Sequence, residues 1–226
     1  MGTRARRARV GSHDEPGDPQ ARVDLQAKTV AASERDEGAR RRWRKRVARL
    51  EPGRIVFVDE CGANVGLVPL RARAPRGERA HGKAPRNRGK NVTLLASMTT
   101  EGMGPCAAVI GSTTKEVFEA YVGQVLASSL RPGQIVVLDN LGAHKGERVR
   151  RLVEERGAEL LFLPPYSTDF SPIEEAFSKL KAFLRRAKAS TKEALVEAMG
   201  RALDVITSED ARGWFGHCGY TTGQSL

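Results

Sequence analysis

Apolar and polar positions divide most of this chain into short strand-like runs and longer segments with helical spacing. Six runs predict strands: residues 55–59, 65–70, 91–98, 106–110, 135–139 and 159–163. The first four follow one another closely, whereas the last two are separated by a helical segment. Strands in succession followed by β-α-β units predict a mixed sheet with helices packed on both faces, and therefore an α/β fold.

Apolar residues at helical spacing predict the helices of the same domain. These segments are residues 115–130, 146–157, 172–188 and a stretch that begins near Ser190. Their starts carry capping signals: Thr113 with Glu116, Ser171 with Glu174, and Ser190 with Glu193. Pro172 occupies the first helical position after Ser171, where its missing N–H costs nothing.

The front of the chain has a different pattern from the rest. Residues 1–24 are rich in Arg, Gly, Pro and Asp without periodicity, and we expect a disordered tail there. Residues 25–53 form a basic helical pattern, which either lies on the larger domain or extends along a DNA backbone. We predict one domain over residues 54–220, followed by a short tail at 221–226.

Composition and charge narrow the class of partner. The 226 residues suffice for one domain and an appendage, and 38 Lys plus Arg against 27 Asp plus Glu give a formal net charge of +11. That excess favours a polyanion such as DNA, although a basic balance can also serve solubility alone. The three cysteines are scattered without a CxxC pair, so they indicate neither a disulfide framework nor a zinc site. Because there is also no secretory signal or membrane-length apolar run, we expect a cytoplasmic protein with no membrane partner.

Three acidic residues occupy positions where an α/β fold can hold side chains over a cleft. Asp59 and Asp139 each follow a β-branched apolar run, and Glu174 stands at a helix start. If the two strands are adjacent and parallel, their ends lie about 5 Å apart, so both carboxylates could bind one ion. Oxygen ligands of this kind suit Mg²⁺, which predicts metal-assisted phosphodiester chemistry on nucleic acid. Each residue also has an ordinary structural role, because aspartates cap turns and Glu174 completes a capping box.

The neighbouring polar residues are weaker candidates. Asn140 and His144 could contact the substrate, but they could equally make local polar contacts at a helix start. Strand alternation points Glu60 away from Asp59. Glu175 has Lys179 four residues on, which is typical of a solvated helix pair and favours a structural role.

Two basic tracts could follow a phosphate backbone. One is a helical stripe that continues from Glu174, and the other is residues 71–90, a Gly- and Pro-broken loop with eight Lys or Arg and one acid. Such a loop carries no direct sequence readout, and solvated loops usually have no specific role. The predicted DNA-contacting residues are Arg71, Arg73, Arg76, Lys83, Arg86, Arg88, Lys90, Lys181, Arg185 and Lys188.

The blocks FVDECG, LDNLGAHK and PPYSTDFSPIEEAFSKLK resemble the three acidic blocks of DDE transposases, and more narrowly those of mariner-related bacterial insertion sequences. The segment DARGWFGHCGY is similar to the usual ending of these enzymes. The resemblance implies an RNase H-like (retroviral-integrase-like) mixed five-stranded sheet with helices on both faces. It also implies that Asp59, Asp139 and Glu174 hold two divalent cations, Mg²⁺ or Mn²⁺, for cleavage by water and then strand transfer by a DNA 3′-hydroxyl.

The same resemblance sets expectations about partners. We expect double-stranded DNA as the substrate and a homo-oligomer assembled on it. Relatives carry an N-terminal helix-turn-helix region that reads the element ends, whereas here only 58 residues precede Asp59. Either a separate recognition subunit or upstream reading-frame product supplies that function, or the chain is a truncated, non-catalytic DNA-binding remnant or regulator. An RNase H-type nuclease acting on RNA–DNA hybrids shares the fold but lacks the block around Glu174.

Overall fold

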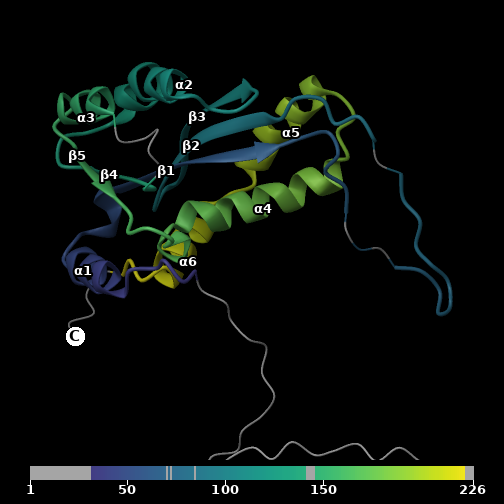
Figure 1. Cartoon of the computed structure of the whole chain (residues 1–226), viewed down its shortest axis with the longest axis horizontal. Coiled ribbons are helices and arrows are strands. Elements are labelled where there is room, and N and C mark those ends of the chain that lie inside the picture. Colours follow the sequence, from purple (N-terminus) through teal and green to yellow (C-terminus); the bar gives the residue numbers. More distant parts are fainter. Residues whose placement is uncertain (1–31, 70, 72, 84, 141–145, 222–226) are drawn as a thin grey trace, which may run out of the picture. The chain divides into compact units, whose positions relative to one another are not determined.

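The computed structural model describes residues 32–69, 71, 73–83, 85–140 and 146–221 (Figure 1). The described residues from Ser33 onward belong to one compact unit. The tail predicted for residues 1–24 lies outside the described residues, as does nearly all of the predicted tail at 221–226. Both therefore stay predictions.

Five strands form one mixed sheet in the order β3-β2-β1-β4-β5 (Figure 1). They are β1 (Ile55–Ala63), β2 (Val92–Thr99), β3 (Gly102–Ile110), β4 (Ile135–Leu138) and β5 (Glu159–Phe162). The first three pair antiparallel, whereas β1, β4 and β5 pair parallel. The predicted mixed five-stranded sheet is confirmed, with the two parallel additions made through helical crossovers.

Three details of the strand prediction are wrong. The strand predicted over residues 106–110 begins at Gly102, where it already pairs with Thr99 of β2. The first strand extends to Ala63 rather than ending at Asp59, because β2 continues to pair with β1 beyond the end of β4. Residues 65–69 form no strand. The Asn64 side chain accepts a hydrogen bond from the Gly66 N–H at 2.9 Å, and this local turn takes the chain out of the sheet.

Helices cover both faces of the sheet (Figure 1). One face carries α1 (Glu37–Val47), α4 (Pro172–Ala187), α5 (Lys192–Asp204) and α6 (Ser208–His217), and the other carries α2 (Lys115–Tyr121) and α3 (Glu147–Glu154). The apolar side chains form one buried cluster on each face. In β1 the side chains alternate: Ile55 and Phe57 join the cluster under α4, and Val56 and Val58 join the one under α2 and α3.

Helix starts agree with the sequence to within one residue, but the caps differ in detail. Thr114 rather than Thr113 caps α2, and Thr191 rather than Ser190 caps α5. Ser171 occupies the N-cap of α4 with Pro172 following, yet its side chain makes no capping hydrogen bond, so the predicted capping box is absent there. The helix α6 was not predicted, although Thr207 and Asp210 form a complete capping box at its start.

The basic helical arm is represented by α1, which packs on the domain. Trp43 and Val47 are buried in the cluster under α4, and the Trp43 indole donates a hydrogen bond to the Tyr220 hydroxyl at 3.1 Å. Arg40 is fully buried; its guanidinium donates to the Asp169 carboxylate at 2.8 and 2.6 Å and lies 4.0 Å from the centre of the Phe170 ring. Of the two arrangements expected for this segment, the structure therefore has the one in which the helix lies on the domain.

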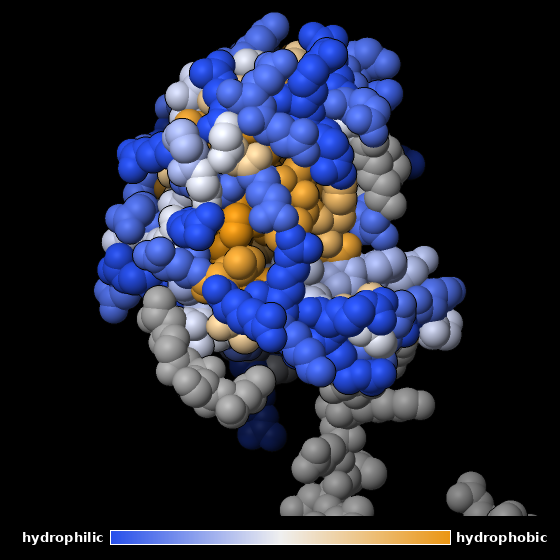
Figure 2. All heavy atoms as spheres, turned by 90° about the vertical axis from the view of Figure 1, so that its left-hand side faces the viewer, coloured by the Kyte–Doolittle hydropathy of each residue, from blue (hydrophilic) through white to orange (hydrophobic). Residues whose placement is uncertain are grey.

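Figure 2 shows the side of the molecule on which α1, α3 and the edge strand β5 lie. Hydrophobic residues gather there in a hollow at the centre, and hydrophilic residues surround it.

None of the helices in the described part of the chain is long and apolar enough to cross a bilayer.

Candidate active site

The pairing of β1 with β4 brings the two aspartates together. Phe57 pairs with Val137 in parallel register, so Asp59 and Asp139 occupy equivalent positions two residues further along neighbouring strands. Both continue the series of side chains that faces α4, because Phe57 and Val137 belong to the buried cluster on that face. Neighbouring strands are about 4.8 Å apart, so the two carboxylates lie side by side at the α4 face of the sheet.

Glu174 reaches the same place from the first turn of α4. The buried side of this helix is formed by Ile173, Phe177, Leu180 and Leu184, as predicted, and Glu174 stands half-buried at its margin. A cavity of about 390 Å³ is lined by Asp59, Asp139 and Glu174 together. Two strands and one helix start, separated by up to 115 residues in sequence, thus supply three carboxylates to one cavity.

The electrostatic surroundings agree with this geometry. Asp59 accepts a hydrogen bond from the Glu60 N–H at 2.7 Å. Beneath the site, the pKa of the Cys61 thiol is raised to about 11, chiefly by burial, with Lys181 opposing the rise and Glu174 and Asp59 adding to it. The two carboxylates and the Lys181 ammonium therefore act on one buried atom. Oxygen donors gathered in this way fit a hard divalent cation such as Mg²⁺.

Residues 163–171 form a wall of this cavity, and they contain a residue that the sequence reasoning missed. Tyr166 lines the cavity, is 60 % exposed and has φ of 53°, a left-handed conformation that is uncommon for a residue other than glycine. Its signal in the sequence is the Pro-Pro pair directly before it, which follows a strand and restricts the backbone.

Residues 169 and 170 of this wall are held by Arg40 of α1 and by Tyr220, which follows α6. The Arg40 guanidinium holds Asp169, and the Tyr220 hydroxyl donates to the Phe170 carbonyl at 2.7 Å. Burial acts to raise the pKa of Asp169, but the hydrogen bonds and charge of Arg40, together with the charge of Arg35, bring it below its usual value. The wall is therefore positioned by a buried cation and a buried tyrosine.

The remaining predicted site residues are placed as follows. Asn140 lines the cavity beside Asp139, whereas His144 lies outside the described residues. Glu60 continues the opposite face of β1, together with Val56 and Val58. The predicted pair between Glu175 and Lys179 is absent: Glu175 contacts His217, and the Lys179 ammonium lies 2.6 Å from an Asp210 carboxylate oxygen.

Both basic tracts are exposed or half-exposed. All eight Lys and Arg of the loop at 71–90 are exposed, and none forms an ion pair with another residue in the described ranges. On α4, Lys181 and Arg185 are half-buried, and Lys188 ends the helix in a left-handed conformation. This loop, which connects β1 to β2 along the chain, extends away from the sheet (Figure 1).

A sheet with this strand order, helices on both faces and carboxylates from β1, the residue after β4 and α4 defines an RNase H-like domain. The family model described as DDE superfamily endonuclease matches residues 54–196, and the chain belongs to this family. No curated protein sequence matches it.

Solved structures of Mos1 transposase share the fold. The Mos1 paired-end complex with left transposon end is 18% identical with a TM-score of 0.70, and the match covers 87% of this chain and 63% of that one. The mariner Mos1 paired end complex with Mg is 18% identical, with a TM-score of 0.63 and coverage of 87% and 64%. The catalytic domain of Mos1 mariner transposase is 17% identical, with a TM-score of 0.54 and coverage of 84% and 92%. This chain thus spans less than two thirds of the length of the Mos1 chains in the two paired-end complexes.

Proposed function

We propose that this chain is the catalytic domain of a DNA transposase, which cleaves DNA strands at the ends of an insertion sequence and transfers them to a target. The observation that carries this proposal is the single cavity lined by Asp59, Asp139 and Glu174. Membership of the DDE superfamily endonuclease family supports it, because the three acids stand in the three blocks that resemble those of DDE transposases.

The proposed cofactor is a pair of divalent cations, Mg²⁺ or Mn²⁺. Asp59, Asp139 and Glu174 would hold them, since all three offer oxygen donors and their mutual repulsion falls when a cation is shared. When bound, such a pair of ions activates the attacking oxygen and stabilises the leaving oxygen of a phosphodiester. The parallel pairing of β1 with β4 supports two of the ligands, since Asp59 lies within β1 and Asp139 directly follows β4, and the first turn of α4 supplies the third.

Basic and aromatic residues near the cavity would contact the DNA. Lys181 and Arg185 continue from Glu174 along α4, and with Lys188 they would follow a phosphate backbone away from the cavity. The cations of the loop at 71–90 would add a second, salt-sensitive contact. Tyr166, exposed at the rim, offers a ring on which an unpaired base next to the cleaved bond can stack. Asn140 and His144 remain proposed auxiliary contacts to the substrate.

Plasmid nicking tests the proposal. A supercoiled plasmid that carries the DNA flanking this reading frame is incubated with the full chain and Mg²⁺ or Mn²⁺, and relaxed product is measured over time. We expect metal-dependent nicking that is lost in Asp59→Asn, Asp139→Asn and Glu174→Gln. The matched control is Glu60→Gln, which removes a carboxylate adjacent to Asp59 on the opposite face of β1 and should nick normally.

The outcomes separate the proposal from its alternative. Equal nicking by the three acid variants and the wild type would refute the assignment of the site. Salt-sensitive DNA binding by the wild type without any nicking, in either metal, would instead support a non-catalytic DNA-binding regulator. We further propose that the working form is a homo-oligomer on double-stranded DNA, which the size of the protein–DNA complex in solution would measure.

A further inference from the structure

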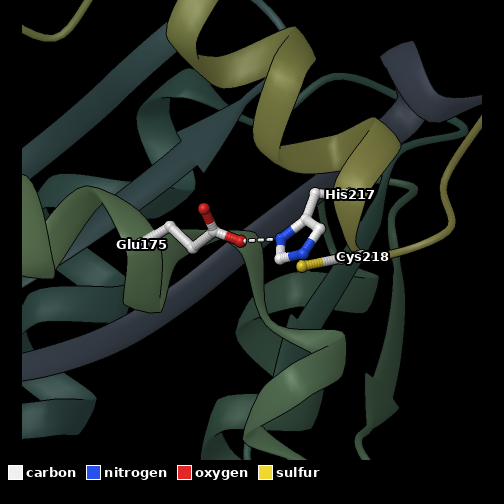
Figure 3. Close-up of side chains that lie close together, drawn as sticks. All are labelled: Glu175, His217 and Cys218. Carbon is white, nitrogen blue, oxygen red and sulfur yellow. Dashed lines mark hydrogen bonds and ion pairs between the residues drawn. The ribbon is translucent and has the colours of Figure 1, made fainter.

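A second group of metal-ligand side chains lies next to the proposed active site. Glu175 from the first turn of α4 faces His217, the last residue of α6, and Cys218 follows at the helix end. One ligand atom of each residue lies within 4.8 Å of the others. Figure 3 shows the side chains of Glu175 and Cys218 directed toward the His217 ring, with the Glu175 carboxylate in contact with Nδ1.

These three residues line a cavity of about 540 Å³. It lies next to the carboxylate cavity, because Thr168, Ser171 and Glu174 line both. Glu175 and Cys218 are half-buried, and the His217 side chain is 78 % exposed. The group is therefore open to ions from solvent, and the exposed imidazole is free to adjust.

The donor set has a definite chemical preference. A thiolate, an imidazole and a carboxylate are the ligands of Zn²⁺ and similar borderline cations, whereas Mg²⁺ takes oxygen donors. The charge of the surroundings also favours a cation, since the Asp169, Glu174 and Glu175 carboxylates line this cavity against the single guanidinium of Arg44. Cys218 itself is a poor candidate for a free nucleophile, because it stands at the carboxyl end of α6, where the helix dipole disfavours a thiolate.

We propose that Glu175, His217 and Cys218 form a second metal site, which binds one zinc-class divalent cation. The ion lies between the Glu175 carboxylate and the His217 ring, and the Cys218 sulfur is its third protein ligand. The proton of the Cys218 thiol is released to solvent, as is any proton that Glu175 and His217 share. Ligand atoms around a tetrahedral zinc lie about 3.3–3.8 Å apart, given bond lengths of about 2.0–2.3 Å. Because no two of the three ligand atoms are more than 4.8 Å apart, side-chain shifts of about 1 Å bring them to this spacing.

The site has two consequences for the domain. Three protein ligands leave one position of a tetrahedral ion open toward the cavity, where Arg44 also lies. The ion also joins the end of α6 to the first turn of α4, one residue from Glu174. Zinc bound there would hold the helix that presents the third carboxylate of the active site.

Cobalt absorption tests the site without any measurement of activity. The full chain is titrated with Co²⁺ in excess Mg²⁺, and the thiolate-to-cobalt charge-transfer band and the competition by Zn²⁺ are recorded. We expect one equivalent of Co²⁺ with a thiolate band that Zn²⁺ abolishes. Cys218→Ser should remove the band, and His217→Ala and Glu175→Gln should each weaken binding at least tenfold.

Cys106→Ser is the matched control, because Cys106 is an exposed cysteine on β3, away from this cavity. It should bind Co²⁺ as the wild type does. A band that persists in Cys218→Ser, or no thiolate band in the wild type at millimolar Co²⁺, overturns the site. Cys61 is the other cysteine with carboxylates near it, those of Asp59 and Glu174. Cys61→Ser should therefore keep the cobalt thiolate band, and loss of the band in this variant would overturn the assignment to Cys218. These readouts do not depend on nicking, so this site and the proposed function can fail independently.

Discussion

Two adjoining cavities of this domain differ in the atoms they offer to a cation. The cavity of Asp59 and Asp139 presents three carboxylates with hydroxyl and amide groups around them but no thiol or imidazole, and two of its acids lie in or directly after paired strands. The cavity of Glu175, His217 and Cys218 mixes oxygen, nitrogen and sulfur, and its ligands come from the ends of two helices. Under the two proposals, consecutive glutamates on α4 serve different chemistry. Ligand type, rather than the mere presence of acids, therefore distinguishes a magnesium-like site from a zinc-like one.

The largest expected effect separates the two cavities by one substitution. Asp139→Asn should reduce metal-dependent nicking by at least about 10²-fold, since it removes one contributor to electrostatic stabilisation of the transition state. The same variant should retain the cobalt thiolate band, because Asp139 lines only the carboxylate cavity. Nicking and cobalt spectra of one protein preparation measure both. Loss of the cobalt band in this variant would mean that the two cavities form one site.

The next effect concerns the wall between the cavities. Arg40→Ala should lower the free energy of unfolding by about 2–3 kcal/mol, because it deletes a fully buried side chain, its charge-assisted hydrogen bonds to the half-exposed Asp169 carboxylate and the cation that lies over Phe170. Urea denaturation measures this. Arg44→Ala is the control: its guanidinium also lies over Phe170, at 5.1 Å, but is exposed and forms no ion pair with a described residue. An equal loss in both variants would show that the Arg40–Asp169 pair contributes nothing of its own.

The same pair predicts a pH dependence. The pKa of Asp169 is lower in the folded chain than its usual value, so its contribution is fully present above the unfolded pKa of about 3.9. That contribution is lost as pH falls through the folded pKa. The stability difference between wild type and Arg40→Ala should therefore shrink below about pH 4, as measured by urea unfolding from pH 3 to pH 6. A difference that stays constant over this range would contradict the electrostatic part of the account.

The smallest expected effect is at the rim. Tyr166→Ala should weaken binding of DNA with an unpaired base beside the cleaved bond by about 1–3 kcal/mol, the usual loss for one stacked base. Tyr166→Phe is the matched control and should bind normally, because stacking uses the ring and not the hydroxyl. Fluorescence anisotropy with labelled DNA compares the three proteins. Equal binding by Tyr166→Ala and the wild type would remove this residue from the substrate contacts.

Much of the carboxylate site could be predicted from the sequence because its determinants are local. Apolar runs of four residues before Asp59 and Asp139 indicate buried strands, and the Ser-Pro-Ile-Glu segment indicates a helix start at Glu174. The extension of β1 beyond Asp59 could not be predicted, since it depends on pairing with β2 from 30 residues away. The local pattern at 65–70 resembled a strand, but the Asn64 turn prevents it.

The second cavity could not be predicted because its ligands are brought together only by packing. The sequence shows three scattered cysteines and no metal-ligand spacing, and Glu175 lies 42 residues before His217. The local sequence predicts an ion pair between Glu175 and Lys179. In the folded chain Lys179 instead pairs with Asp210 at the start of α6. A missed helix, α6, thus explains both the wrong ion pair and the missed cluster.

The proposed function requires that Asp59, Asp139 and Glu174 share a site for divalent cations. A crystal of the full chain soaked in Mn²⁺, measured by anomalous scattering, tests this directly and requires no knowledge of the DNA ends. We predict Mn²⁺ in the cavity of about 390 Å³, with Asp59 and Asp139 among its ligands. Mn²⁺ bound elsewhere only, or the three carboxylates directed away from one another, would contradict the proposed function.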